Sequence, residues 1–172
     1  TGAIPIALVP FAKSDKKTPA TDIYQVIYDD LQNSGRFNLI ETNNLRQQPH
    51  TAKGVNFNFW RELKVNDVIT GSVKRTKSGN YEVKIALVDL YNKGAGKSPV
   101  LFQEEYEVDE SVLRNLAHHI SDLIYEKITG NRGVFSTRIA YILVKHEENG
   151  KSRYSLEVAD ADGFNPKPLL VS

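Results

Sequence analysis

A short loop, Gly94-Ala95-Gly96-Lys97-Ser98, carries the residue types that bind phosphate in nucleotide-binding proteins. In such proteins the glycine-rich loop follows a strand and leads into a helix, whose first backbone N–H groups hold the phosphates. The motif also needs a glycine where Tyr91 stands, and the residues after Pro99 alternate in polarity as a strand does. We therefore interpret this loop as a solvated connection and predict no nucleotide site.

The acidic residues of Asp160-Ala161-Asp162-Gly163 are of the kind that ligate calcium in an EF-hand loop. If Gly163 is taken as the invariant glycine of such a loop, Val158 and Leu169 occupy the first and last ligand positions. Neither side chain has an oxygen to donate. Because Asp and Gly are also the residues that turns require, we predict a turn between two strands.

The four histidines have no metal-binding spacing. His118 and His119 are neighbours on a predicted helix, where adjacent side chains point about 100° apart. His50 and His146 lie in other segments, and the sequence contains no H-x-x-x-H pair. We therefore predict surface or partly buried histidines and no metal site.

Carboxylate pairs can perform acid-base catalysis when they converge on one substrate. Here they occur as sequence neighbours that diverge on a helix or a strand: Asp29-Asp30, Glu104-Glu105 and Glu147-Glu148. The chain has no cysteine and no G-x-S-x-G nucleophile motif. The sequence therefore predicts no catalytic residue, no cofactor-binding residue and no enzymatic activity.

Trp60, Phe57 and Phe59 are aromatic residues of the kind on which bases stack in single-stranded nucleic-acid sites. The chain balances 22 Lys and Arg residues with 21 Asp and Glu residues, and no basic patch accompanies the aromatic cluster. We therefore expect these rings to pack in a core. We expect protein or small-molecule partners and no nucleic acid.

The composition is typical of a soluble globular protein, since 40% of the 172 residues are hydrophobic and 25% are charged. The densest apolar run, Ile139 to Val144, is far shorter than the roughly 18 residues of a membrane span. Because the sequence contains no methionine, we expect a processed or excised fragment whose signal peptide lay before Thr1.

The beginning of the chain predicts a β-α-β unit. An apolar run at 4–11 is bounded by prolines, as in a strand covered on both faces. From Asp22 the apolar residues follow helical spacing, and Gly35 stands where a left-handed residue ends a helix. Residues 37–40 alternate as a second strand, which we expect to pair in parallel with the first.

The next segments predict a short helix, a hairpin, a strand and a long helix. The short helix is expected at 56–65, and hairpin strands at 68–77 and 81–90 flank the turn residues 78–80. A strand at 100–108 and a helix that ends at Gly130 follow. One face of the second hairpin strand is expected to lie under helices: Tyr81, Val83, Ile85 and Leu87.

This pattern predicts an α+β domain of residues 1–130, in which two or three helices cover one face of a mixed sheet of about five strands. Residues 131–172 differ, because they lack helical periodicity and predict strands at 138–146, 153–160 and 168–172. The first of these strands is apolar on both faces, and so short a segment cannot cover it. We expect the linker Gly130-Asn131-Arg132-Gly133 and then the incomplete start of a larger β structure, packing poorly or pairing with a neighbouring chain.

The order of these elements resembles the N-terminal domain of the TolB family. The likeness rests on Ser34-Gly35-Arg36-Phe37 after the first helix, and on Trp60 shortly before Val68-Ile69-Thr70-Gly71-Ser72-Val73. The segment from Gly133 to Ile142 resembles the entry of that family's chain into its β-propeller, and Leu156 to Asn165 resembles the first propeller repeat. The resemblance covers essentially the whole chain and implies that residues 131–172 are a linker and strands of a truncated propeller blade.

The resemblance also implies a non-catalytic adaptor in the periplasm of Gram-negative bacteria. Proteins of this family link a TolA-like inner-membrane protein to the Pal lipoprotein, and they support outer-membrane integrity, cell division and macromolecule import. The family's TolA-contacting segment is expected to lie before Thr1, and most of its Pal-binding propeller face is expected to lie beyond this chain. No partner-binding residue is assigned.

Two other interpretations are left open by the sequence. The segment from Ile23 to Glu41 and the strand Ile69-Thr70-Gly71 also resemble outer-membrane assembly proteins of the curli-secretion lipoprotein type, which have no counterpart to 133–165. A small-molecule or RNA-binding module would need a concave or basic face. The net charge of +1 argues against RNA.

Overall fold

A computed structural model describes residues 2–13, 19, 21–91 and 98–136, together with the backbone of strands at 139–146, 152–159 and 167–171. The helices are α1 (Ile23–Asn33), α2 (Phe57–Glu62) and α3 (Leu113–Thr129), with short 3-10 turns η1 (Ala52–Gly54) and η2 (Glu110–Val112). The strands are β1 (Ile4–Leu8), β2 (Ala12–Lys13), β3 (Phe37–Leu39), β4 (Asp67–Arg75), β5 (Tyr81–Asp89), β6 (Val100–Val108), β7 (Ile139–His146), β8 (Ser152–Ala159) and β9 (Lys167–Val171).

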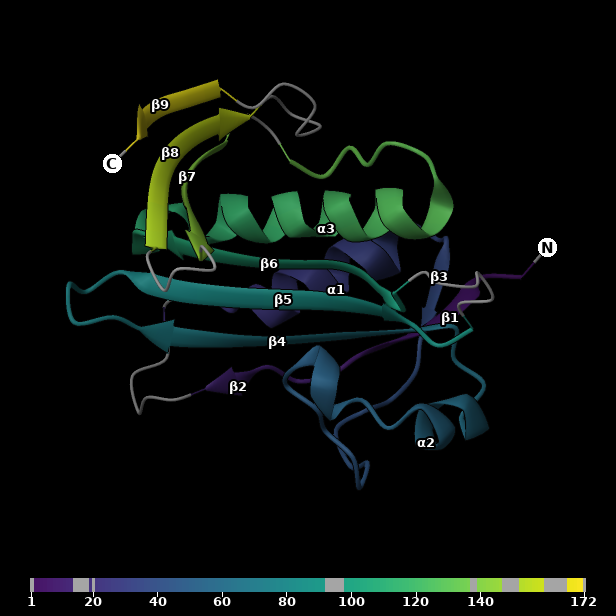
Figure 1. The fold of residues 1–172 in the computed structure, drawn as a ribbon. Helices are drawn as coiled ribbons and strands as arrows, with labels where there is room; N and C mark the ends of the chain where they lie inside the picture. Colours follow the sequence, from purple (N-terminus) through teal and green to yellow (C-terminus); the bar gives the residue numbers. More distant parts are fainter. Residues whose placement is uncertain are drawn as a thin grey trace.

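Five strands form the predicted mixed sheet, in the order β3-β1-β4-β5-β6 (Figure 1). β1 pairs in parallel with both β3 and β4, which confirms the expected β-α-β unit. β4, β5 and β6 follow one another as antiparallel neighbours, so the predicted hairpin is also present. The hairpin connection is longer than expected, because β4 ends at Arg75 and not at Lys77.

α1 and α3 pack side by side on one face of this sheet (Figure 1). The Asp22 carboxylate caps α1 by accepting a hydrogen bond from the backbone N of Gln25 at 3.2 Å, and Gly35 follows with a left-handed φ of 72°. The larger core lies between the two helices and the sheet. It contains the four β5 side chains predicted to share the helix-covered face, Tyr81, Val83, Ile85 and Leu87.

α2 lies on the opposite face, so the prediction that the helices cover one face is wrong for this helix. Ile6 and Leu8 of β1 belong to the larger core, whereas the alternate residues Ala7 and Val9 belong to a second core. Trp60 of α2 is fully buried in that second core. The physical reason is that β1 and the first half of β4 are apolar on both faces, so each face needs a cover.

A bulge follows β1 at Pro10. Leu8 pairs with Ile69 and Ala12 pairs with Ser72. The chain from β1 to β2 therefore has one residue more than the stretch of β4 that it pairs with. The ring of Phe11 then lies over Gly71, where a Cβ atom would stand 2.9 Å from Phe11 Cε1 and 2.8 Å from the Lys84 carbonyl oxygen. Gly71 is therefore required by the close approach of its neighbours.

The residues after α3 fold back onto that helix. Gly130 ends α3 with a left-handed φ of 77°, as predicted. The buried carboxylate of Asp122 then accepts hydrogen bonds from the backbone N of Phe135 at 2.8 Å and of Ser136 at 3.0 Å, and from the Ser136 hydroxyl. The Phe135 ring packs edge-on against Tyr125. Residues 135 and 136, which directly follow the predicted linker, are therefore fixed to α3.

The three predicted strands of the last segment are present as β7, β8 and β9, which pair in antiparallel order. The structure differs from the expectation that they stand apart from the first sheet. β7 pairs with β6 through Tyr106 with Leu143 and Glu107 with Ile142. The outer edge of β6 offers unpaired backbone groups, and β7 satisfies part of that edge. The assignment of these strands to a propeller blade stays a prediction.

Candidate interaction surface

The phosphate-like and calcium-like motifs form no described site. Residues 92–97 and 160–166 lie outside the described residues, so only Ser98 of the first motif can be placed. Its hydroxyl accepts a hydrogen bond from the backbone N of Val100 at 3.1 Å, at the start of β6. A strand, and not a helix, therefore follows the glycine-rich loop, as predicted.

The two adjacent histidines have separate surroundings. His118 Nδ1 lies 2.6 Å from the Asp30 carboxylate and connects α3 to α1. His119 is buried against the Tyr106 ring, and burial lowers its pKa, although the nearby Asp122 opposes that change. His50 is exposed, and the side chain of His146 is outside the described part. Among the described residues, no group of three or more His, Cys, Asp or Glu could hold a metal ion.

The carboxylate neighbours have individual structural roles where they are described. Asp29 accepts a hydrogen bond from the Gln25 amide at 2.8 Å, while Asp30 faces His118. Glu104 and Glu105 lie on β6, where successive side chains point to opposite faces. Glu147 and Glu148 are outside the described residues. Asp29 and Asp30 therefore have different partners on different sides of α1.

The prediction that the aromatic cluster packs in a core is confirmed for Trp60, while Phe57 and Phe59 lie at the edge of that core. Trp60 is fully buried, and Phe57 and Phe59 are partly buried against the same group of residues. The indole N–H of Trp60 donates to the Gln47 side-chain oxygen, which also accepts from the backbone N of Asn56 at 2.9 Å. Gln47 therefore fixes the loop before α2 to the buried side of the helix.

The exposed side of α2 carries stacked arginines, which sequence reasoning missed. The Arg61 guanidinium lies 5.4 Å from the centre of the Phe57 ring and 5.6 Å from that of Tyr91. It also donates to the Leu90 carbonyl oxygen, from Nε at 2.8 Å and from Nη2. Arg61 is thus held in one orientation between two rings, although its side chain is exposed.

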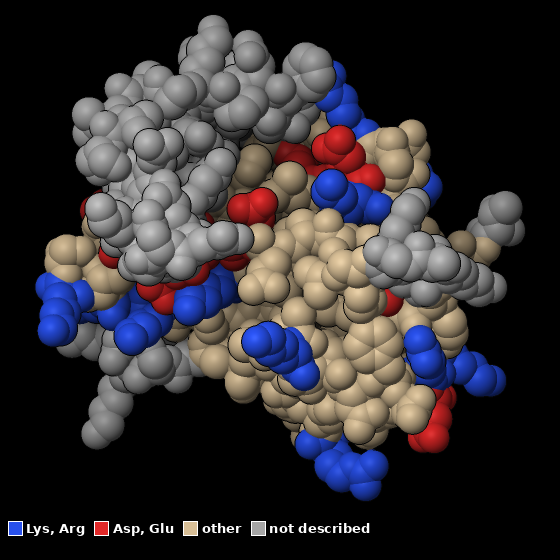
Figure 2. All heavy atoms as spheres, viewed as in Figure 1, with Lys and Arg blue, Asp and Glu red and all other residues tan. Residues whose placement is uncertain are grey.

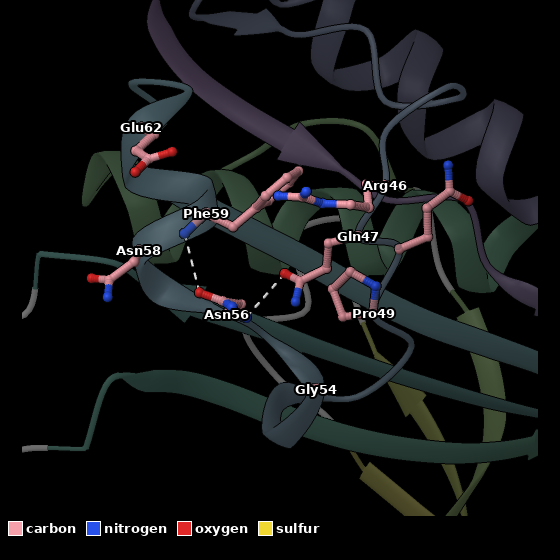
Figure 3. Close-up of a pocket in the computed structure, with 9 residues that line it drawn as sticks. Arg46, Gln47, Pro49, Gly54, Asn56, Asn58, Phe59 and Glu62 are labelled. Atoms are coloured by element: carbon pink, nitrogen blue, oxygen red, sulfur yellow. Dashed lines mark hydrogen bonds between the residues drawn. The ribbon is translucent and has the colours of Figure 1, made fainter.

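A second arginine lies over the neighbouring ring of the same helix. The Arg46 guanidinium is 5.6 Å from the centre of the Phe59 ring, beside a cavity of about 610 Å³ (Figure 3). Asn56 turns its side chain to cap α2, accepting from the backbone N of Phe59 at 3.1 Å. Amides and one carboxylate provide the rest of the polar lining: Gln47, Gln48, Asn58 and Glu62.

Exposed apolar side chains adjoin these stacks. Leu63, directly after α2, is 37% exposed, and Tyr91, against Arg61, is 41% exposed. The surface over α2 and its preceding loop carries few charges, and its basic side chains are isolated (Figure 2). Protein interfaces are enriched in arginine and aromatic residues and depleted of other charges at their centre. We call Arg46, Phe57, Phe59, Arg61, Leu63 and Tyr91 the α2 surface.

Two carboxylates face each other beside the α2 surface. Asp67, the first residue of β4, pairs directly with Asp89, the last residue of β5. Asp67 is 6% exposed, and burial, followed by the charge of Asp89, raises its pKa to about 7. The Asp89 carboxylate accepts a hydrogen bond from the backbone N of Tyr91 at 2.9 Å.

Neither the α2 surface nor the Asp67–Asp89 pair was predicted from the sequence, for different reasons. The α2 surface has a local signal, since Phe57 and Arg61 are four residues apart and therefore neighbours on a helix. Asp67 and Asp89 have no local sequence signal, because only the register of the β4–β5 hairpin brings them together.

A family model and several relatives of this chain carry the same family name. The family model described as the TolB amino-terminal domain matches residues 1–95. The Tol-Pal system protein TolB of Coxiella burnetii is 47% identical, over 100% of this chain and 39% of its own length. The proteins of the same name from Hydrogenovibrio crunogenus and Nitrosococcus oceani are 39% and 40% identical, each over 99% of this chain and 38% of their own length.

A solved structure gives the same family. The crystal structure of TolB from Acinetobacter baumannii superposes with a TM-score of 0.64 at 32% identity, covering 100% of this chain and 39% of that chain. The chain therefore spans about two fifths of the length of the proteins it matches. No described helix is both long and apolar enough to cross a membrane.

Proposed function

The chain belongs to the TolB family, and from that premise we propose that it forms part of a non-catalytic periplasmic adaptor of the Tol-Pal trans-envelope system. In this role it supports outer-membrane integrity, cell division and macromolecule import. Its partners are proteins: the Pal lipoprotein and a TolA-like inner-membrane protein. The curli-secretion alternative is not favoured, since the family model and the relatives named above carry the TolB name.

The α2 surface is the observation that supports an adaptor role for this part of the chain. It combines two arginines stacked on rings with partly exposed Leu63 and Tyr91. Holding Arg61 between two rings lowers the entropy that the side chain loses when a partner binds. A surface built in this way favours protein docking over turnover of a small molecule.

A deletion and complementation experiment tests the proposal. We expect deletion of the parent gene to release periplasmic proteins into the medium and to sensitise cells to detergent. The full-length gene should restore both properties, and the double variant Arg61→Ala, Leu63→Asp should restore them only in part. Lys77→Ala, an exposed change at the far end of the β4–β5 hairpin, is the matched control and should complement fully.

The two outcomes that contradict the proposal are distinct. A deletion strain with an intact outer membrane would rule out the adaptor role itself. Full complementation by the double variant, at equal protein level, would leave the adaptor role but remove the α2 surface as its docking site. A melting curve of the purified double variant checks that the change has not unfolded the chain.

A further inference from the structure

The pairing of Asp67 with Asp89 places two carboxylates at the open end of the larger core. Directly opposed residues of an antiparallel pair point to the same face, and like charges in that arrangement repel. The next residues of each strand fix which face this is. Ile69 and Leu87, two steps along each strand, belong to the core under α1 and α3, so the carboxylates point to that side.

No cation from the described residues compensates this pair. Asp67 is more than nine-tenths buried. Among the described residues, its carboxylate forms no ion pair and no hydrogen bond. Lys127, from the last turn of α3, lines the same space but is exposed and makes no ion pair with either carboxylate. A largely buried carboxylate without an ion-pair partner is costly when it is ionised, and a bound cation would lower that cost.

The space in front of the carboxylates has both polar and apolar walls. It is a cavity of about 600 Å³, with Asp67 and Asp89 joined by Asn66. Ile4, Leu101 and Ile128 supply aliphatic surface from β1, β6 and α3, and Tyr91 supplies an aromatic ring. We call this cavity the carboxylate pocket.

We propose that the carboxylate pocket binds a cation carried on an aliphatic stem, as presented by a lysine or arginine side chain of a docked protein. The carboxylates receive the charged head, the aliphatic walls cover the stem, and the Tyr91 ring attracts the cation across its face. The assignment of the stem to a partner protein rests on the proposed adaptor function. The binding of a cation to the pocket does not rest on that function.

The lining favours an organic cation over a metal ion. Calcium takes about six to eight oxygen ligands, and magnesium needs a near-octahedral oxygen shell. The pocket instead supplies two carboxylates and the side chain of Asn66, while its other lining residues are three aliphatic side chains, a tyrosine ring and the exposed Lys127. Tyr91 also belongs to the α2 surface, where it stacks on Arg61. A protein seated on that surface is therefore next to the pocket and can place a side chain in it.

Amide NMR of the 172-residue chain tests the proposal with Nα-acetyl-lysine methylamide as the probe. At a pH above about 7, where Asp67 is ionised, we expect saturable shifts at Asn66, Asp67, Asp89 and Tyr91. Asp67→Asn should weaken binding at least about tenfold, equivalent to the loss of about 1.4 kcal/mol. The matched neutral probe, Nα-acetyl-norleucine methylamide, should give no saturable shift.

Three results would overturn the proposal. The first is equal binding of the norleucine probe, and the second is lysine binding that Asp67→Asn leaves unchanged. The third is tighter binding of calcium chloride at the same amides, which would make the site a metal site. Asp89→Asn provides a second variant in case Asp67→Asn alters the fold.

The chain's own Lys93 and Lys97 provide a further discrimination. The double variant Lys93→Ala, Lys97→Ala should bind the probe as the parent chain does. If only the double variant binds it, one of these lysines already fills the pocket, and the partner side chain is excluded. Because every readout is binding to the isolated chain, the result does not depend on whether the deletion strain shows an envelope defect.

Discussion

Asp67 makes the free energy of unfolding depend on pH. Its pKa is 3.8 in a solvated chain and about 7 in the fold, so between these values the folded state holds more protons than the unfolded state. The free energy of unfolding therefore falls as the pH rises from about 4 to about 7. The contribution of Asp67 to the free energy of unfolding is complete below pH 3.8 and lost above about pH 7.

We predict that Asp67→Asn removes this dependence. The stability of the variant relative to the parent should rise by about 2 to 4 kcal/mol between pH 4 and pH 8, since each unit of pKa difference corresponds to about 1.4 kcal/mol. Urea unfolding at a series of pH values measures it. The buffers should contain no amines, because an amine could occupy the carboxylate pocket.

The exposed Asp29→Asn is the control for this series. It should leave the pH profile of the parent unchanged. A parent profile that is flat between pH 4 and pH 8, or one that persists in Asp67→Asn, would show that another group titrates.

Gly71 has a separate prediction based on space. A Cβ at this position would stand 2.8 Å from a backbone carbonyl oxygen, which cannot move aside without shifting β5. Gly71→Ala should therefore cost about 1 to 3 kcal/mol, measured by chemical denaturation. Gly2→Ala, which has open space around the added methyl, should cost nothing measurable. Equal stability of the two variants would contradict the packing of Phe11 over Gly71.

At the residue scale, the sequence predicted the special backbone positions better than the site. Gly35 and Gly130 were identified because a left-handed residue after an apolar helical stripe has a local signal. The role of Gly71 was not identified, since the bulge at Pro10 that carries Phe11 over it depends on the pairing of β1 and β2 with β4. Non-local register also explains why the facing of Asp67 and Asp89 was missed.

Among the elements, α3 is the main support of the larger core. Leu116 and Ile124 are fully buried in it, between the sheet and α1. Replacing either by Ala should lower the free energy of unfolding by about 2 to 5 kcal/mol, through lost burial and the cavity that remains. Thermal melts measure the change, with the exposed Arg114→Ala on the same helix as the control. An unchanged melting temperature for Leu116→Ala would contradict this placement.

The segment after α3 depends on one buried carboxylate. Asp122→Ala removes the three hydrogen bonds that its carboxylate accepts from residues 135 and 136. We predict faster hydrogen exchange at the amides of Phe135 and Ser136, and a loss of about 1 to 3 kcal/mol of stability. Ser136→Ala removes only the hydroxyl bond and should accelerate exchange less.

This prediction concerns a local contact, so exchange in β4 and β5 is the internal reference. If Asp122→Ala accelerates exchange in those strands to the same extent as at Phe135, the carboxylate supports the whole fold. The sequence contained a hint of this contact. Asp122 stands beside Leu123 and Ile124 in the apolar part of the helix, where a buried carboxylate needs donors.

The helices and strands themselves were largely predictable. Periodicity located α1, α3 and the hairpin because each has several apolar residues on one side. The side of the sheet on which α2 lies was not predictable in this way. A helix of six residues shows only that Trp60 is buried, and the face against which it packs is set by the path of the preceding loop.

For the whole molecule, the boundary between the first domain and the last segment is the feature to test. We propose that residues 1–130 contain a self-contained domain and that the residues following form a linker and the start of a propeller. The Asp122 contacts extend the useful boundary to Ser136. A chain that ends at residue 136 should melt within a few degrees of the full chain, while a chain that ends at 130 should melt lower.

A large loss of stability on removal of β7, β8 and β9 would contradict this division. Two residue pairs join β7 to β6, whereas β5 and β6 pair along almost their whole length. Slow hydrogen exchange across β7 in the monomer would lead to the same conclusion as a lower melting temperature. The sequence predicted the strands of this segment correctly but not their contact with β6. Family membership therefore rests on the matched relatives and not on the isolation of these strands.

The placement of α1 and α3 on one face and α2 on the other gives the sheet two independent sides. Away from Tyr91, which borders both the α2 surface and the carboxylate pocket, ligands seated on opposite sides cannot collide, so neither has to leave before the other arrives. Any influence of one on the other must cross a single layer of strands whose hydrogen-bonded register resists sliding. We therefore expect binding on the two sides to be additive for ligands that do not contact the shared edge at Tyr91.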